Sequence, residues 1–133
     1  MIRKVAPFAL FLAAPLSAAG SQPQLNPLQE TALQCSALFA IVTGEQARHT
    51  PGSAALPALG TRGREYFVLT SARLMDETGM GRDQVRDLMV ARVRQTSQRL
   101  ATSRDASAVM AAGLKPCLAL LDAEVPVPGR RPR

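Results

Sequence analysis

The two cysteines, Cys35 and Cys117, are the side chains of this sequence with the clearest chemical potential. A cysteine can act as a nucleophile, bind a metal or form a disulfide. Nucleophilic catalysis needs a base beside the thiol, and the lone histidine, His49, precedes a flexible loop with nothing to place it near Cys35. Neither a Cys-x-x-Cys redox pair nor a haem-attachment motif is present. Three interpretations remain: a disulfide, which we favour, two buried free thiols, or a catalytic thiol.

Other reactive groups are sparse. Glu45 and His49 lie four residues apart, the spacing of a two-ligand metal clip, but a stable site needs more ligands and there is no second histidine. Asp76 and Glu77 are adjacent, so on a helix they point in different directions and make a poor acid–base couple. No glycine-rich phosphate loop follows a strand pattern. We therefore predict a protein that is not an enzyme and uses no metal or cofactor.

The net charge of +6 belongs mostly to the two ends of the chain. Five of the 16 basic residues lie at 3–4 and 130–133, and the remaining 11 nearly balance the 10 acidic residues. A nucleic-acid binder usually carries its excess charge on its docking face. The sequence therefore predicts no nucleic-acid partner. The C-terminal arginines could touch an anionic surface, although we favour a solvated tail.

Four segments with helical patterning must position these residues. Asn26 before Pro27, with Gln29 at the third helical position, is a typical capping box, and Gly79 and Asp105 are a stop and a start signal. We expect the second helix to be the most buried, because its apolar residues cover a wide arc: Phe67, Val68, Ala72, Leu74 and Met75. We expect a break or kink near Pro116. The predicted fold is all-α, a compact four-helix arrangement with helices over 27–48, 61–78, 82–102 and 106–112 plus 116–123.

The predicted helices place the cysteines at matching heights. Cys35 lies about two turns after the start of the first helix, and Cys117 about two turns before the end of the last. In an up-down-up-down bundle those helices are antiparallel neighbours, so the two positions become level. We predict a disulfide between them. On the third helix, Arg92 falls inside the apolar stripe, where it would form a buried ion pair, bind an anion, or extend from the edge of the stripe into water.

The N-terminus has the pattern of a secretion signal. Arg3 and Lys4 precede an apolar stretch over 5–16, and small residues at 17–19 suit cleavage after Ala19. The apolar stretch is about 15 residues long, short of the ~20 that span a bilayer. The alternatives are a retained anchor or a misassigned start. The predicted organisation is a signal peptide at 1–19, a polar leader at 20–26, a helical domain at 27–124 and a disordered Pro/Arg tail at 125–133.

Residues 79–88 resemble the turn and recognition-helix start of helix-turn-helix DNA-binding domains. The matching positions are Gly79, Met80, Val85 and Leu88. The segment departs from the motif at Met75, where a small residue is usual, and Asp83 and Asp87 would face phosphates. The alternative function is therefore a cytoplasmic helix-turn-helix regulator with a mispredicted start.

Two stretches resemble a group of small, uncharacterised, exported bacterial proteins: 35–39 (CSALF) and the run 63–79, from GREYF through MDETG. This resemblance implies export but no particular activity. The predicted architecture is also similar to that of periplasmic acid-stress chaperones, which share no motif with the chain, so no functional residue is carried over.

These features together predict an exported, non-catalytic helical binding or chaperone-like protein of the bacterial envelope. Its location would be periplasmic or secreted, with no stable membrane span after signal cleavage. Its partner would be an unidentified protein or client. A third possibility, an enzyme with an unrecognised site, would require a deep polar pocket with a strongly shifted titrating group.

Overall fold

The fold is all-α, as predicted. The computed structural model describes residues 24–127 and 129, so the predicted signal peptide, most of the leader and all three tail arginines lie outside the described residues. No strand occurs within this part of the chain. A short 3-10 helix, η1 (Ser53–Ala55), interrupts the first connection, and the four helices are α1 (Pro27–Ala47), α2 (Gly60–Thr78), α3 (Arg82–Thr102) and α4 (Ala106–Glu124).

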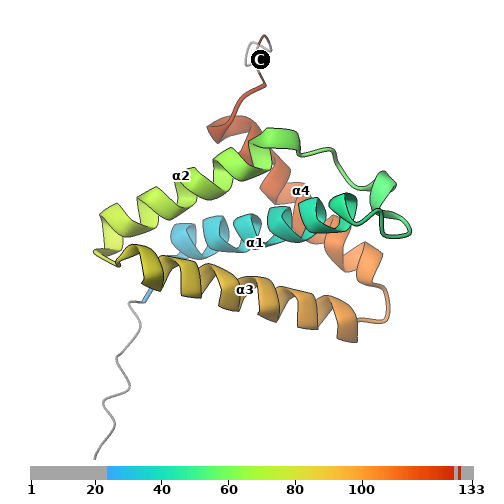
Figure 1. Ribbon diagram of the computed structural model, residues 1–133, viewed down its shortest axis with the longest axis horizontal. Coiled ribbons are helices and arrows are strands. Elements are labelled where there is room, and N and C mark those ends of the chain that lie inside the picture. The colour runs from blue at the N-terminus through green and yellow to red at the C-terminus, as the bar shows by residue number, and fades with distance from the viewer. Residues whose placement is uncertain (1–23, 128, 130–133) are drawn as a thin grey trace, which may run out of the picture.

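Helix α1 lies at the centre of the molecule. Figure 1 shows it between α2 and α3, with α4 crossing behind it, and all three of these helices pack on α1. Nine residues of α1 are buried, at positions distributed around much of its circumference: Gln29, Ala32, Leu33, Cys35, Ser36, Ala37, Leu38, Phe39 and Val42. A helix that is buried on several sides must be apolar or small on several sides, which these residues provide.

The expectation that the second helix is the most buried is wrong. Helix α2 buries only one narrow stripe, made of Gly63, Tyr66, Thr70 and Leu74. Phe67 and Val68, which were expected inside, are exposed. The apolar arc of α2 is wide, but α1, α3 and α4 together cover only part of it, so Phe67, Val68 and Leu69 face solvent.

The predicted helix ends are confirmed by their hydrogen bonds. The Asn26 side chain accepts from the Gln29 backbone N–H at 2.9 Å, and the Gln29 side chain accepts from the Asn26 backbone N–H at 2.9 Å. Gly79 ends α2 in the left-handed conformation with φ 72°. The Asp105 carboxylate accepts from the Ala108 N–H at 2.9 Å at the start of α4. Each of these ends is set by short-range sequence, which explains why it was predictable.

Helix α4 is continuous through Pro116, so the predicted division into two pieces is wrong. Proline at this position removes one backbone donor and crowds the carbonyl four residues earlier. Burial of residues on both sides of Pro116 against α1, including Leu114 and Leu121, offsets the free-energy cost of this proline. Val125, the first residue of the predicted tail, is also buried, and its carbonyl accepts from Arg62 Nε at 2.7 Å. The packed domain therefore continues one residue into that tail.

Two clusters form the core. The larger joins α1, α2 and α4, and within it Phe39 and Tyr66 meet edge to face with ring centroids 5.2 Å apart. The smaller lies under the α2–α3 turn and consists of Leu33, Leu74, Met80, Val85 and Met89. With few aromatic residues in the chain, this core is mainly aliphatic and sulfur-containing.

Candidate functional site: a groove over the disulfide

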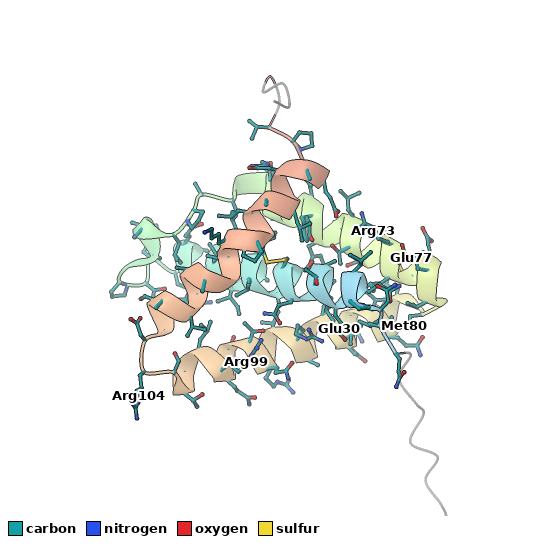
Figure 2. All side chains as sticks on the ribbon, turned by 180° about the vertical axis from the view of Figure 1, so that it is seen from behind. Glu30, Arg73, Glu77, Met80, Arg99 and Arg104 are labelled. Atoms are coloured by element: carbon teal, nitrogen blue, oxygen red, sulfur yellow. A yellow bond between two sulfur atoms is a disulfide. The ribbon has the colours of Figure 1, made fainter. Side chains whose placement is uncertain are left out.

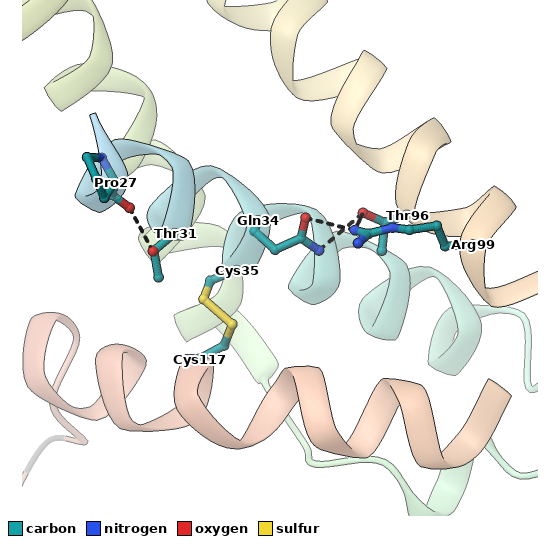
Figure 3. Close-up of a disulfide and its surroundings, with 7 residues drawn as sticks. All are labelled: Pro27, Thr31, Gln34, Cys35, Thr96, Arg99 and Cys117. Atoms are coloured by element: carbon teal, nitrogen blue, oxygen red, sulfur yellow. Dashed lines mark hydrogen bonds between the residues drawn. A yellow bond between two sulfur atoms is a disulfide. The ribbon is translucent and has the colours of Figure 1, made fainter. Parts of the chain in front are cut away.

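Cys35 and Cys117 form a disulfide, as predicted from their heights on the two helices. Their Cα atoms are 5.2 Å apart, within the ordinary range for this bond. The bond links positions 82 residues apart in sequence and ties α4 to the middle of α1 (Figure 3). Both cysteines are buried. The free-thiol and catalytic-thiol interpretations are therefore excluded for this oxidised structure.

A groove of about 440 Å³ runs beside this bond, between α1, α3 and α4. Figure 2 shows α3 and α4 converging toward Arg104 and separating toward the N-terminal end of α1, where Glu30 lies. The groove is lined by residues of all three helices: Glu30, Thr31, Gln34, Cys35, Leu38, Arg92, Thr96, Arg99, Leu100, Val109, Gly113, Pro116 and Cys117. We call it the α1–α3–α4 groove.

One wall of the α1–α3–α4 groove is polar. Gln34 links α1 to α3, because its amide nitrogen donates to Thr96 Oγ1 at 3.2 Å and its oxygen accepts from Arg99 Nη2 at 3.1 Å (Figure 3). Arg92 donates to Glu30 Oε2 at 2.6 Å. Within the described residues Arg99 has no carboxylate partner, so its charge is not neutralised by a neighbouring acid.

The opposite wall is apolar and belongs to α4. Val109 and Pro116 are exposed along it, and Gly113 lies between them. Gly113 brings α4 close to α1, because a Cβ atom at this position would lie 3.1 Å from Leu38 Cδ1. The absence of a side chain at 113 therefore sets the depth of the groove at this point.

Arg92 makes a cross-helix ion pair, one of the alternatives that the sequence left open. Its side chain is 18% exposed and that of Glu30 is 45% exposed, so the pair is half-buried at the edge of the groove. A pair of this kind fixes the register between α1 and α3 more than it adds stability. Glu77, for which no role was expected, accepts from Gln29 Nε2 at 2.8 Å and ties the end of α2 to the start of α1. Asp76 is exposed.

The α1–α2 interface has a different polar character. Three hydroxyl groups, those of Ser36, Tyr66 and Thr70, are buried there without a hydrogen-bond partner among the described residues. Burial raises the pKa of Tyr66, with a smaller contribution from the nearby charge of Glu124, and the charge of Arg73 and the adjacent Thr70 hydroxyl oppose this rise. The Tyr66 and Thr70 hydroxyls are thus neighbours, although their geometry does not meet that of a hydrogen bond. Tyr66 has no exposed surface, so this shifted group belongs to the core rather than to an accessible polar pocket.

The remaining candidates from the sequence are engaged in local contacts. Glu45 accepts from Arg48 Nη2 at 2.6 Å, and His49 is exposed at the helix end with φ 51°. Among the described residues, no three His, Cys, Asp or Glu side chains are grouped so that they could hold a metal ion. Glu45 and His49 thus form no larger donor set here.

The helix-turn-helix-like segment presents few free charges. Arg86 donates to Asp83 at 3.0 Å and to Asp87 at 3.0 Å, and its pKa is raised by these two carboxylates, Asp87 foremost. This face of α3 would meet DNA. Its carboxylates neutralise the positive charge of Arg86 that would otherwise bind phosphate.

Helix α4 is long and apolar enough to cross a membrane by length and composition alone, a property that the sequence analysis overlooked. In the structure its buried stripe packs on α1 and is tied there by the disulfide, and the rest of its surface is mostly exposed alanine, with Val109 among the exposed residues. This surface includes the apolar wall of the groove.

Sequence reasoning missed the groove and several residues that line it, among them Glu30, Gln34, Arg99 and Val109. One signal was present, since Arg92, Thr96 and Arg99 follow the i, i+4, i+7 spacing of a single helix face. Polar residues along a helix face that otherwise packs on the core indicate that neighbouring helices cover this face only in part. No protein-family model matches the chain, and no similar protein was found among curated proteins or solved structures.

Proposed function

We propose that this chain is an exported, non-catalytic binding protein of the bacterial envelope, and that the α1–α3–α4 groove holds an apolar group of its ligand or partner. The observation that carries the proposal is the groove itself, with an apolar wall from α4 facing a polar wall from α1 and α3. Sites of this size, mostly apolar with a few placed polar groups, are typical of ligand binding.

The side chains of the groove favour binding over catalysis. Its one carboxylate, Glu30, is engaged by Arg92, and both of its sulfur atoms are consumed in the disulfide. Catalysis by a nucleophile or a general base requires a free group of suitable pKa. Hydrogen-bond donors and an apolar surface, in contrast, are sufficient for recognition.

The disulfide supports both the location and the binding role. Such bonds persist mainly in oxidising compartments, which agrees with export. The bond also holds α4 against α1 directly beside the groove. A wall that is fixed before binding loses less conformational freedom when a ligand arrives, which favours affinity.

Binding of the neutral apolar dye N-phenyl-1-naphthylamine to the oxidised mature protein tests this proposal. We expect its emission to rise on binding and Val109→Asp to weaken binding about tenfold or more, because the variant places a charge on the apolar wall. The matched control is Val90→Asp on α3, which does not line the groove. The two valines are equally accessible, with Val109 48% and Val90 50% exposed. No dye binding, or equal losses in both variants, would contradict the role of the groove.

The location is tested separately by fractionating cells that express the full chain. We expect the protein in the extracytoplasmic fraction, shortened by residues 1–19. An intact chain recovered only from the cytoplasm would contradict export and would revive the DNA-binding alternative.

A further inference from the structure

We propose that the ligand of the α1–α3–α4 groove is an anionic single-chain amphiphile of the fatty-carboxylate class, with its carboxylate on Arg99 and its hydrocarbon chain along α4. This inference rests on the proposed function and specifies its ligand. Three features carry it: the charge of Arg99, the chemistry of the two walls, and the size of the groove.

Arg99 gives the groove an uncompensated positive charge. The groove contains two arginines and one carboxylate, and that carboxylate, Glu30, lies 2.6 Å from Arg92. Arg99 instead contacts only neutral oxygens in the described part of the chain, Gln34 Oε1 at 3.1 Å and Thr96 Oγ1 at 3.4 Å. A guanidinium has several donors and pairs well with a carboxylate, so it can receive an anion while keeping one of these bonds.

The neighbouring groups complete a small polar subsite. Thr96 is buried and accepts from the Gln34 amide, which fixes the orientation of that amide. The amide oxygen in turn accepts from the Arg99 guanidinium, which lies between Gln34 and Thr96 (Figure 3). Arg99 is exposed to solvent, and these two bonds to neutral oxygens restrain its guanidinium before any ligand arrives.

The α4 wall distinguishes a hydrocarbon chain from a peptide. The α4 residues that line it are Val109, Gly113, Pro116 and Cys117, none of which offers a free polar side chain. An extended peptide would place backbone N–H and C=O groups against this wall, where they would lose water without gaining partners. A hydrocarbon chain has no such requirement and gains from covering Val109 and Leu100, which keep apolar surface exposed.

The size of the groove fits one chain. Its volume of about 440 Å³ is in the lower part of the range for small-molecule sites. The two helices that border it, α3 and α4, converge toward Arg104 (Figure 2). A site of this volume suits a single unbranched chain better than a broad ligand.

The experiment compares three ligands with the same twelve-carbon chain, the two ionic ones used below their micelle concentrations and the alcohol below its solubility limit. Dodecanoate, dodecanol and dodecyltrimethylammonium are titrated against the oxidised mature protein carrying the neutral dye. We expect dodecanoate to displace the dye at about tenfold lower concentration than dodecanol, the effect of one charge-assisted hydrogen bond. The cationic ligand should be the weakest.

The variant Arg99→Gln should remove the tenfold preference for dodecanoate while leaving dodecanol unchanged. The matched control is Arg104→Gln, because Arg104 is exposed on the α3–α4 connection and does not line the groove. It should keep the preference. Circular dichroism of both variants verifies that they fold.

Equal displacement by all three ligands, or a preference that survives Arg99→Gln, would overturn the fatty-carboxylate assignment. In either case dye binding that is sensitive to Val109→Asp would leave the proposed function standing. If the dye does not bind the wild-type protein at all, the proposed function and this inference both fail.

Discussion

The two sides of helix α1 are held in contrasting ways. On the α4 side, a disulfide, a glycine and aliphatic side chains make the contact, and Gly113 brings the two helices close. On the α2 side, the hydroxyls of Ser36, Tyr66 and Thr70 are buried without partners among the described residues. Helix α2 is also tethered to α4, by Arg62–Asp122 at 2.6 Å and Arg73–Glu124 at 2.9 Å.

This contrast indicates which interface of α1 contributes more to stability and which one substitutions could improve. A buried polar group without a partner costs free energy that an apolar group of the same shape would not. Replacing a hydroxyl at the α1–α2 interface by an apolar group should therefore raise the free energy of unfolding. The α1–α4 interface has no buried hydroxyl of this kind among the described residues. The candidate groove borders the better-matched side, as a preformed binding site requires.

The largest expected effect is loss of the disulfide. The double variant Cys35→Ser/Cys117→Ser should lower the free energy of unfolding by about 4 kcal/mol, because the bond closes a long loop of the unfolded chain. Urea denaturation followed by circular dichroism measures this change. A loss below about 1 kcal/mol would mean that the α1–α4 side does not depend on the bond.

Gly113→Ala should lower the free energy of unfolding by about 1–3 kcal/mol, since the new methyl group would lie 3.1 Å from Leu38 Cδ1. The matched control is Gly44→Ala on α1, whose nearest neighbour is the flexible Arg48 side chain at 3.4 Å. The free energy of unfolding of that variant should rise by about 0.5–1 kcal/mol, because alanine favours the helix more than glycine does. If both variants gain stability by the same urea assay, the close approach of α4 to α1 is not as described.

Tyr66→Phe should leave the free energy of unfolding unchanged or raise it by up to about 1 kcal/mol, because it deletes a hydroxyl without a partner and keeps the ring against Phe39. Thermal unfolding is a sufficient measurement. A clear loss of stability would show that the hydroxyl is hydrogen-bonded and would remove the contrast between the two sides of α1.

The smallest effect is the pH dependence that Tyr66 imposes. Burial raises its pKa in the folded protein, so above about pH 10 the unfolded chain releases a proton that the folded chain retains. The unfolded state then binds fewer protons, and the free energy of unfolding falls as pH rises. This fall should be smaller in Tyr66→Phe.

The titration can be followed directly, because Tyr66 is the only tyrosine and the chain has no tryptophan. Absorbance of the folded protein near 295 nm should report an apparent pKa above that of the urea-unfolded chain. Identical titrations in the two states would contradict the burial of the phenol.

Local signals in the sequence determined much of the fold. The capping residues Asn26 and Asp105 and the left-handed Gly79 act within one helical turn, so they predicted helix ends correctly. The disulfide followed from helix lengths and chain direction. The helix ends require no knowledge of how the helices are arranged, whereas the disulfide also required the first and last helices to be antiparallel neighbours.

Features that depend on tertiary packing could not be predicted in this way. The exposure of Phe67 and the continuity of α4 through Pro116 depend on which neighbours cover each helix. The groove depends on α3 and α4 diverging over α1, which no single helix encodes. Residues such as Gln34 and Arg99 acquire their roles only from that divergence.

The most direct test of the central claim, that an exported protein holds α1 to α4 through an oxidised Cys35–Cys117 bond beside its groove, is the intact mass of native protein after alkylation. We predict a chain that lacks residues 1–19, carries no alkyl group and weighs two hydrogens less than the dithiol. A full-length chain with two alkylated cysteines would contradict the claim.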